Sequence, residues 1–154
     1  DVHQQLTQHS QVDPCFPKLV HLLQANDVYP VILSEGYDLS LSFHNVQEYI
    51  DEVYCSKLNT AKGKLTGELQ VLNEKRWSYN KQCLGCCICK VDFLTELRKQ
   101  RKITQSFAVG DGGSDGCLFQ YVDVSFSLNP KYNATYQAIN LHEVFMILQE
   151  TLEC

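Results

Sequence analysis

Short apolar runs alternate along the chain with amphipathic stretches. Phe16–Leu23 has apolar residues at near-helical spacing and predicts a helix. The run Val28–Leu33 is rich in β-branched residues and predicts a buried strand that ends in a turn at Ser34-Glu35-Gly36. The same criteria predict a helix over Phe43–Ile50 and a strand over Glu52–Ser56.

The second half of the chain repeats this alternation. Residues 59–70 place two glycines among short polar and apolar residues, which favours a hairpin or an extended excursion, and residues 71–89 have no regular pattern. The remaining predictions are a helix over Val91–Arg101, a strand over Ser106–Val109, one or two helical turns over 115–120, a strand over Val122–Phe126 and a helix over Tyr136–Leu152.

Strands that alternate with helices indicate an α/β fold, with a parallel sheet flanked by helices. In such sheets ligands bind beyond the carboxyl ends of the strands. Two polar turns fall at this place, Ser34-Glu35-Gly36 and Gly110–Asp115. We therefore expect the functional residues at these two turns.

Composition and charge exclude several classes of function. The 154 residues suffice for about one domain, and 44% of them are hydrophobic, as in a globular protein. The net charge is -5, which gives no electrostatic basis for binding nucleic acid. No apolar run approaches the length of about 20 residues that a membrane span requires, and the first residues show no secretory signal pattern.

Four of the eight cysteines form a cluster, Cys83, Cys86, Cys87 and Cys89. Because the chain has enough apolar residues for a core, we expect reduced thiols and a reducing compartment, the cytoplasm or an organelle interior. Thiolates bind Zn²⁺, but this spacing is tighter than that of a usual tetrahedral site. Free or buried thiols are therefore favoured over zinc, and a redox or metal-handling protein is the most distant hypothesis.

Three segments of the chain carry candidate chemistry. Asp111 and Asp115 lie four residues apart on a glycine-rich turn and could bind Mg²⁺, although Asp115 could also be an ordinary helix cap. Ser34 could hold a phosphate oxygen or could cap a turn. Lys90 opens a predicted helix and could balance the charge of a phosphoryl group, or it could simply be solvated.

In order, these segments read VILSEGYD, CICKVDFLTEL and SFAVGDGGSD. Together they resemble the haloacid dehalogenase superfamily of phosphatases, more narrowly the branch that contains phosphoserine phosphatase and the phosphatases of methylthioribose salvage and phosphocholine. The resemblance covers residues 12–150 and includes Gly63–Glu68. It implies a Rossmann-like core and a Mg²⁺-dependent phosphomonoesterase.

The resemblance also implies a role for each candidate residue. Ser34, with the backbone amides of Glu35 and Gly36, would bind the phosphoryl oxygens, and Lys90 would balance the charge of the nucleophile and the phosphate. Asp111 would be a Mg²⁺ ligand, and Asp115 would orient Lys90 or assist the metal. Ser114 stands where relatives often carry Asn, which weakens the local hydrogen bonding.

One departure from the family is large. Its nucleophile is the first Asp of an Asp-x-Asp motif at the end of the first strand, and this sequence contains no such motif. Asp1-Val2-His3 mimics it only loosely. We expect residues 1–13 to be the tail of a helical cap or a linker, and 14–154 to form the core, with 59–89 as an irregular excursion. The nucleophile strand and most of the cap would then lie upstream of Asp1 or be lost.

Two hypotheses follow. In the first, the chain belongs to a Mg²⁺-dependent phosphomonoesterase that acts on a phosphorylated small molecule, and it is inactive without the missing nucleophile. In the second, it is a non-catalytic protein of the same fold, a structural or interaction subunit of a larger assembly. An exposed sheet edge would then pair with a protein partner. The sequence does not name a substrate for either hypothesis.

Overall fold

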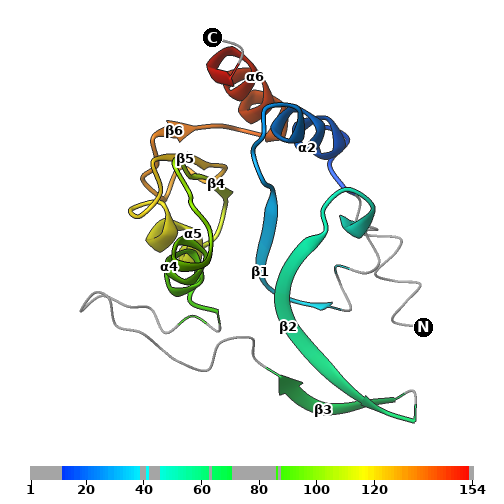
Figure 1. Ribbon diagram of the computed structural model, residues 1–154. Helices are drawn as coiled ribbons and strands as arrows, with labels where there is room; N and C mark the ends of the chain where they lie inside the picture. Colours follow the sequence, from blue (N-terminus) through cyan, green and yellow to red (C-terminus); the bar gives the residue numbers. More distant parts are fainter. Residues whose placement is uncertain are drawn as a thin grey trace. The chain divides into compact units, whose positions relative to one another are not determined.

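The computed structural model describes residues 12–38, 41, 46–62, 64–70, 86 and 88–152. The chain divides into two units, Asp1–Glu74 and Lys75–Cys154, whose elements are drawn in Figure 1. None of the helices in the described ranges is long and apolar enough to cross a membrane. Residues 1–11 lie outside the description, so the expected boundary between residues 13 and 14 stays a prediction.

The described part of the first unit contains the α-helix α2, a short 3₁₀ helix and a three-stranded sheet. Its elements are α2 (Phe16–Ala25), β1 (Val31–Tyr37), the 3₁₀ helix η1 (Val46–Glu48), β2 (Glu52–Ala61) and β3 (Lys64–Gln70). The strand order is β1-β2-β3, with β1 and β2 parallel and β2 and β3 antiparallel. The predicted helix over 16–23 is confirmed, and the predicted strand at Glu52 is confirmed and continues to Ala61. Residues 43–45 of the helix expected over 43–50 lie outside the described residues.

The predicted start of the first strand is wrong by three residues, because the end of α2 uses the backbone there. The Val28 N–H donates to the Leu23 carbonyl and the Asp27 N–H donates to the Gln24 carbonyl, while Asp27 has φ 56°. These bonds form a Schellman motif, in which a left-handed residue closes the helix. Pro30 has no N–H to offer a strand ladder, so pairing begins at Val31.

The predicted turn at Ser34-Glu35-Gly36 is an irregularity inside β1, which continues to Tyr37. Leu33 pairs with Tyr54 and Tyr37 pairs with Ser56, so β1 has two more residues than β2 between these pairs. The Gly36 N–H donates to the Ser34 hydroxyl at 3.0 Å, which satisfies a backbone donor that the ladder does not use.

The hairpin expected within residues 59–70 is confirmed. β2 and β3 are joined by two residues, and Ala61 pairs with Lys64 across the turn. Lys62 has φ 51°, as the first residue of a tight hairpin turn of type I′ requires.

The second unit alternates helices with a parallel sheet. Its elements are α4 (Lys90–Gln100), β4 (Phe107–Gly110), α5 (Gly113–Leu118), β5 (Val124–Ser127), β6 (Tyr136–Gln137) and α6 (Leu141–Leu152). The strand order is β4-β5-β6, all parallel. The core contains mainly aliphatic and aromatic side chains: Ile88, Val91, Ala108, Phe119, Phe126, Val144 and Leu148. The predicted α/β alternation is thus confirmed for residues 90–127.

The last predicted helix begins five residues later than expected. Tyr136 and Gln137 pair with Phe126 and Ser127 of β5 and form a short strand instead. The helix begins only after Asn140, whose side-chain oxygen accepts the N–H of Glu143 at 3.0 Å. Helical spacing of apolar residues extends back beyond this cap, but the sheet holds the backbone of residues 136–138.

A side-chain network joins the starts of β4 and β5. Asp123 accepts the Ser106 hydroxyl at 2.6 Å and the Ser106 N–H at 2.7 Å, and Arg98 of α4 donates to the same hydroxyl at 3.0 Å. The hydrogen bond from the Ser106 hydroxyl lowers the pKa of the Asp123 carboxyl most, and the bond from the Ser106 N–H lowers it further. The Arg98 charge adds to the effect.

Replacing Asp123 with asparagine is expected to destabilise the chain more at neutral pH than at about pH 2. Because the pKa of Asp123 is lowered on folding, its charge stabilises the folded state above its ordinary pKa of about 4. This contribution is lost as the pH falls through the lowered pKa. Urea midpoints of the wild type and the variant at both pH values would test this. An equal difference at both would contradict it.

Candidate functional site

The turn after β4 carries the predicted acidic residues. β4 ends at Gly110, two residues follow, and α5 begins at Gly113. Because β4 is parallel to β5, this turn lies at the carboxyl end of the sheet in the second unit. Asp111 and Asp115 therefore stand where ligands bind in parallel α/β sheets.

A buried ion pair joins α4 to α5. The Lys90 ammonium lies 2.5 Å from Asp115 Oδ1, and each side chain is only 9% exposed. Lys90 is the first residue of α4, and Asp115 lies in the first turn of α5. The structure thus brings together two residues that are 25 positions apart. Buried charges of this kind are tolerated when they are paired and hydrogen-bonded.

The second oxygen of Asp115 holds the turn itself. Asp115 Oδ2 accepts the Gly112 N–H at 2.9 Å and the Asp111 N–H at 3.2 Å. Its carboxylate therefore has three partners, which use three of its about four lone-pair sites and leave little capacity to bind a metal. This arrangement fixes both the path of the backbone and the position of the Lys90 ammonium.

Gly110 is the residue that lets this carboxylate approach. A Cβ built on Gly110 would lie 2.2 Å from Asp115 Cγ, far closer than two carbon atoms can pack. The first glycine of the turn is therefore required by close approach of a side chain to the backbone.

Asp111 has the free carboxylate of the turn, because its side chain is exposed and Asp115 is engaged elsewhere. Mg²⁺ prefers carboxylate and water oxygens, and protein sites often supply only one or two carboxylates, with substrate phosphates completing the shell. Within the described ranges no group of three His, Cys, Asp or Glu side chains is placed to hold a metal. A single carboxylate such as Asp111 suits a Mg²⁺ ion that is also bound by a substrate phosphate. It does not suit a site in which protein side chains alone surround the metal.

Sequence reasoning missed the support for this turn from β5. The Asn129 amide donates to the Asp111 carbonyl at 3.2 Å, and the Leu128 N–H donates to the Gly110 carbonyl at 2.8 Å. The fully buried Ser127 hydroxyl in turn donates to the Asn129 carbonyl at 2.7 Å. The sequence did contain an indication of this support, because Asn129 is a polar residue that closely follows the strand next to β4.

Ser34 belongs to the first unit, whereas Lys90, Asp111 and Asp115 belong to the second. It lies near the carboxyl end of β1 and is half-buried, and its oxygen accepts the Gly36 N–H. Glu35 is exposed. The hydroxyl hydrogen of Ser34 remains available to a ligand oxygen.

Two of the four clustered cysteines, Cys83 and Cys87, lie outside the described residues, so the zinc hypothesis is not tested. Among the described cysteines, Cys55 and Cys89 are free thiols. Burial raises the pKa of the Cys55 thiol, and the nearby Asp38 charge raises it further.

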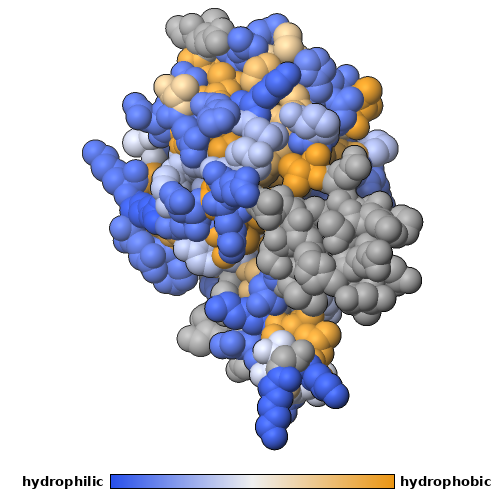
Figure 2. Space-filling model, turned by 90° about the vertical axis from the view of Figure 1, so that its right-hand side faces the viewer, coloured by the Kyte–Doolittle hydropathy of each residue, from blue (hydrophilic) through white to orange (hydrophobic). Residues whose placement is uncertain are grey.

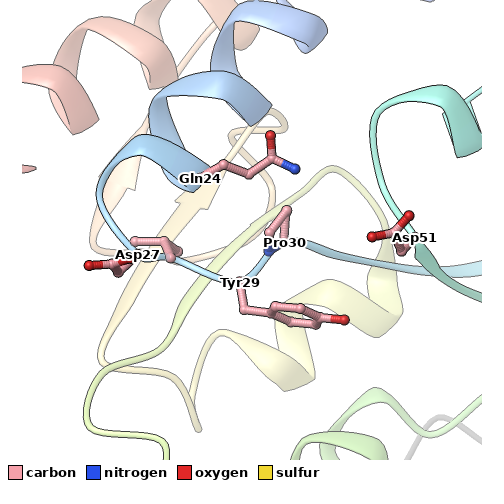
Figure 3. A pocket seen from close by; sticks show the side chains of 6 residues that line it. Gln24, Asp27, Tyr29, Pro30 and Asp51 are labelled. Carbon is pink, nitrogen blue, oxygen red and sulfur yellow. The ribbon is translucent and has the colours of Figure 1, made fainter.

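A cavity of about 270 Å³ lies at the other end of the first unit's sheet, before β1 and β2 begin. Figure 3 shows Gln24, Tyr29 and Pro30 around it, with Asp51 at the start of β2. Asp27 also lines this cavity. Two carboxylates repel an anion, so the cavity does not suit phosphate.

Solved structures similar to this chain are phosphoserine phosphatases. The enzyme from T. onnurineus matches 94% of the chain at 18% identity with a TM-score of 0.67, and a probable phosphoserine phosphatase from Vibrio cholerae matches 97% at 20% identity with a TM-score of 0.72. A phosphoserine phosphatase solved as a phospho-aspartyl intermediate analogue matches 85% at 19% identity, with a TM-score of 0.63.

These matches show that the chain has the mixed α/β fold of these phosphoserine phosphatases, with a parallel sheet and helices as the sequence predicted. The chain spans only 62%, 46% and 61% of the lengths of the three structures, in the same order. No protein-family model and no curated protein matches the sequence.

Proposed function

We propose that the chain supplies the phosphate-binding, charge-balancing and Mg²⁺-binding residues of a phosphomonoesterase of the phosphoserine phosphatase kind. The observation that carries this proposal is the buried Lys90–Asp115 pair beside the exposed Asp111 carboxylate, at the carboxyl end of β4. The likeness of the fold to phosphoserine phosphatases supports it. The substrate would be a small phosphomonoester such as phosphoserine.

Lys90 would stabilise the charge on the phosphoryl group. An ammonium has three donors, so pairing with Asp115 leaves donors for phosphate oxygens. Because Asp115 is held by two backbone N–H groups as well, the ammonium is positioned before the substrate arrives. Preorganised charge of this kind costs no rearrangement in the transition state.

Asp111 would hold Mg²⁺, which would neutralise phosphoryl charge and orient the group. Asp115 would act through Lys90, as a positioning residue. By the family resemblance, Ser34 would donate its hydroxyl hydrogen to a phosphoryl oxygen, while its own oxygen accepts the Gly36 N–H. The nucleophilic carboxylate would come from outside these 154 residues, because the sequence has no Asp-x-Asp motif.

Hydrolysis of p-nitrophenyl phosphate by the chain, in Mg²⁺ and in EDTA, tests this division of roles. We expect no turnover from a folded sample in either condition. Turnover that requires both Mg²⁺ and Asp111 would show that the chain contains its own nucleophile, and Asp1 would be the first residue to replace.

The absence of the Asp-x-Asp motif also favours a second candidate, a non-catalytic subunit of the same fold. Within the described residues, β1 pairs with β2 alone and β4 with β5 alone, so each of these parallel strands has one edge to which a partner strand could add. Val109, in the apolar strand β4, is 37% exposed. A protein partner would cover these edges. Absence of phosphate binding, together with absence of turnover, would favour this candidate.

A further inference from the structure

Asp111 is an exposed residue on a fixed backbone. Hydrophilic side chains cover much of the face drawn in Figure 2, so exposure alone does not distinguish its carboxylate. What distinguishes Asp111 is that hydrogen bonds hold both peptide groups next to its Cα. On the N–H side, Asp115 Oδ2 accepts the N–H groups of Asp111 and Gly112 at 3.2 and 2.9 Å.

The segment that follows β5 holds the carbonyl groups of the same two peptides. The Leu128 N–H donates to the Gly110 carbonyl at 2.8 Å. The Asn129 side-chain amide donates to the Asp111 carbonyl at 3.2 Å. The backbone of Asp111 is thereby fixed, and its carboxylate moves only by rotation about the side-chain bonds. A ligand that is positioned before the metal arrives loses less freedom on binding.

Asn129 is itself held in place. Its side-chain oxygen accepts the Lys131 N–H at 3.1 Å, which fixes the amide with its nitrogen toward Asp111. The fully buried Ser127 hydroxyl donates to the Asn129 carbonyl at 2.7 Å and accepts the Asn129 N–H at 3.2 Å. The Tyr132 N–H also donates to the Asn129 carbonyl, at 3.1 Å. The chain thus builds a rigid donor for the Asp111 carbonyl.

We propose that Asn129 is a positioning residue for Mg²⁺, which sets the backbone of Asp111 so that the carboxylate is in place before the metal binds. This inference rests on the proposed function, because it adds Asn129 to the same phosphate and Mg²⁺ site. Asn129 acts through Asp111, since both ends of its side-chain amide are engaged. Residues that orient a metal ligand in this way typically contribute about ten- to a hundredfold to metal affinity.

Phosphate binding by the complete chain, measured by isothermal titration calorimetry over a series of Mg²⁺ concentrations, tests this role. In Asn129→Ala we expect the half-saturating Mg²⁺ concentration to rise by about tenfold, with the phosphate affinity at saturating Mg²⁺ unchanged. If Asn129 only stabilised the turn, its replacement would weaken phosphate binding at every Mg²⁺ concentration, because the Asp115 and Lys90 side chains would shift as well.

Two further variants sharpen the test. Ser127→Ala keeps the Asn129 amide but loosens the backbone that carries it, so we expect a smaller rise in the same direction. Asn140→Ala is the matched control, because Asn140 is an exposed asparagine of the same unit that accepts the Glu143 N–H before α6, away from the turn. Its replacement should leave the half-saturating Mg²⁺ concentration unchanged.

The outcomes separate this inference from the proposed function. If the wild type binds phosphate in a Mg²⁺-dependent way and Asn129→Ala needs no more Mg²⁺ than the wild type, the inference is overturned and the proposed function stands. The same holds if Asn129→Ala loses phosphate affinity at saturating Mg²⁺, or if Asn140→Ala raises the Mg²⁺ requirement equally. A wild type whose phosphate binding does not respond to Mg²⁺ overturns both.

Discussion

Replacing Asp115 with asparagine should lower the free energy of unfolding by about 3 kcal/mol, because it leaves the Lys90 ammonium buried beside a neutral group. Lys90 is only 9% exposed and its charge is matched by the Asp115 carboxylate at 2.5 Å. An asparagine has nearly the same shape and can still accept the N–H groups of Asp111 and Gly112. The loss therefore reports mainly on the unpaired charge, and urea denaturation measures it.

The matched control is the exposed ion pair on the same helix. Lys99 Nζ lies 2.6 Å from Glu96 Oε1, but these side chains are 65% and 51% exposed. Glu96→Gln removes the same kind of interaction in water, where such pairs contribute about 0.5 kcal/mol. If the Asp115 and Glu96 variants lost equal free energy of unfolding, burial of the Lys90–Asp115 pair would not be what makes it stabilising.

Replacing Gly110 with alanine should destabilise the chain by an amount similar to the loss of the ion pair, about 3 kcal/mol. The new Cβ would lie 2.2 Å from Asp115 Cγ, so the carboxyl group has to move. When it moves, both the Lys90 contact and the N–H bonds to the turn lengthen. The fold of the turn and the position of the ammonium are thus lost together.

Gly112→Ala is the matched control for this substitution, two residues along the same turn. Its Cβ would lie 3.3 Å from Asp115 Oδ2, a tight contact that a small shift relieves. We expect a loss of about 1 kcal/mol or less from urea denaturation. A Gly110→Ala variant as stable as the Gly112→Ala variant would show that Asp115 can move away without cost.

Where one physical signal dominates, the sequence predicts the fold well. Helical spacing places α2 and α4 almost residue by residue, and a glycine-containing turn between two alternating stretches predicts the β2–β3 hairpin. The misplaced boundaries have a common cause in tertiary or capping hydrogen bonds. The Val28 N–H closes α2 and does not join β1, and two residues before α6 pair with β5 instead.

The candidate site is predictable only in part for the same reason. The contacts of Asp115 with the backbone at positions 111 and 112 are local, and a Gly-Asp-Gly turn suggests them. The contact with Lys90 spans 25 positions, and only the resemblance to a phosphatase family pointed to it. The support from Asn129 and Ser127 depends on which strand lies beside β4, which periodicity does not determine.

The most direct test of the central claim is the binding of inorganic phosphate to the complete chain, measured by isothermal titration calorimetry in Mg²⁺ and in EDTA. We expect binding in Mg²⁺ that weakens by about tenfold or more in EDTA or in the Asp111→Asn variant. Asp111 is exposed, so this variant should fold normally, and Asp51→Asn provides an exposed carboxylate in the first unit as the control. Phosphate binding that ignores both EDTA and Asp111→Asn, or that is lost equally in Asp51→Asn, would contradict the claim that Lys90, Asp111 and Asp115 form a phosphate and Mg²⁺ site.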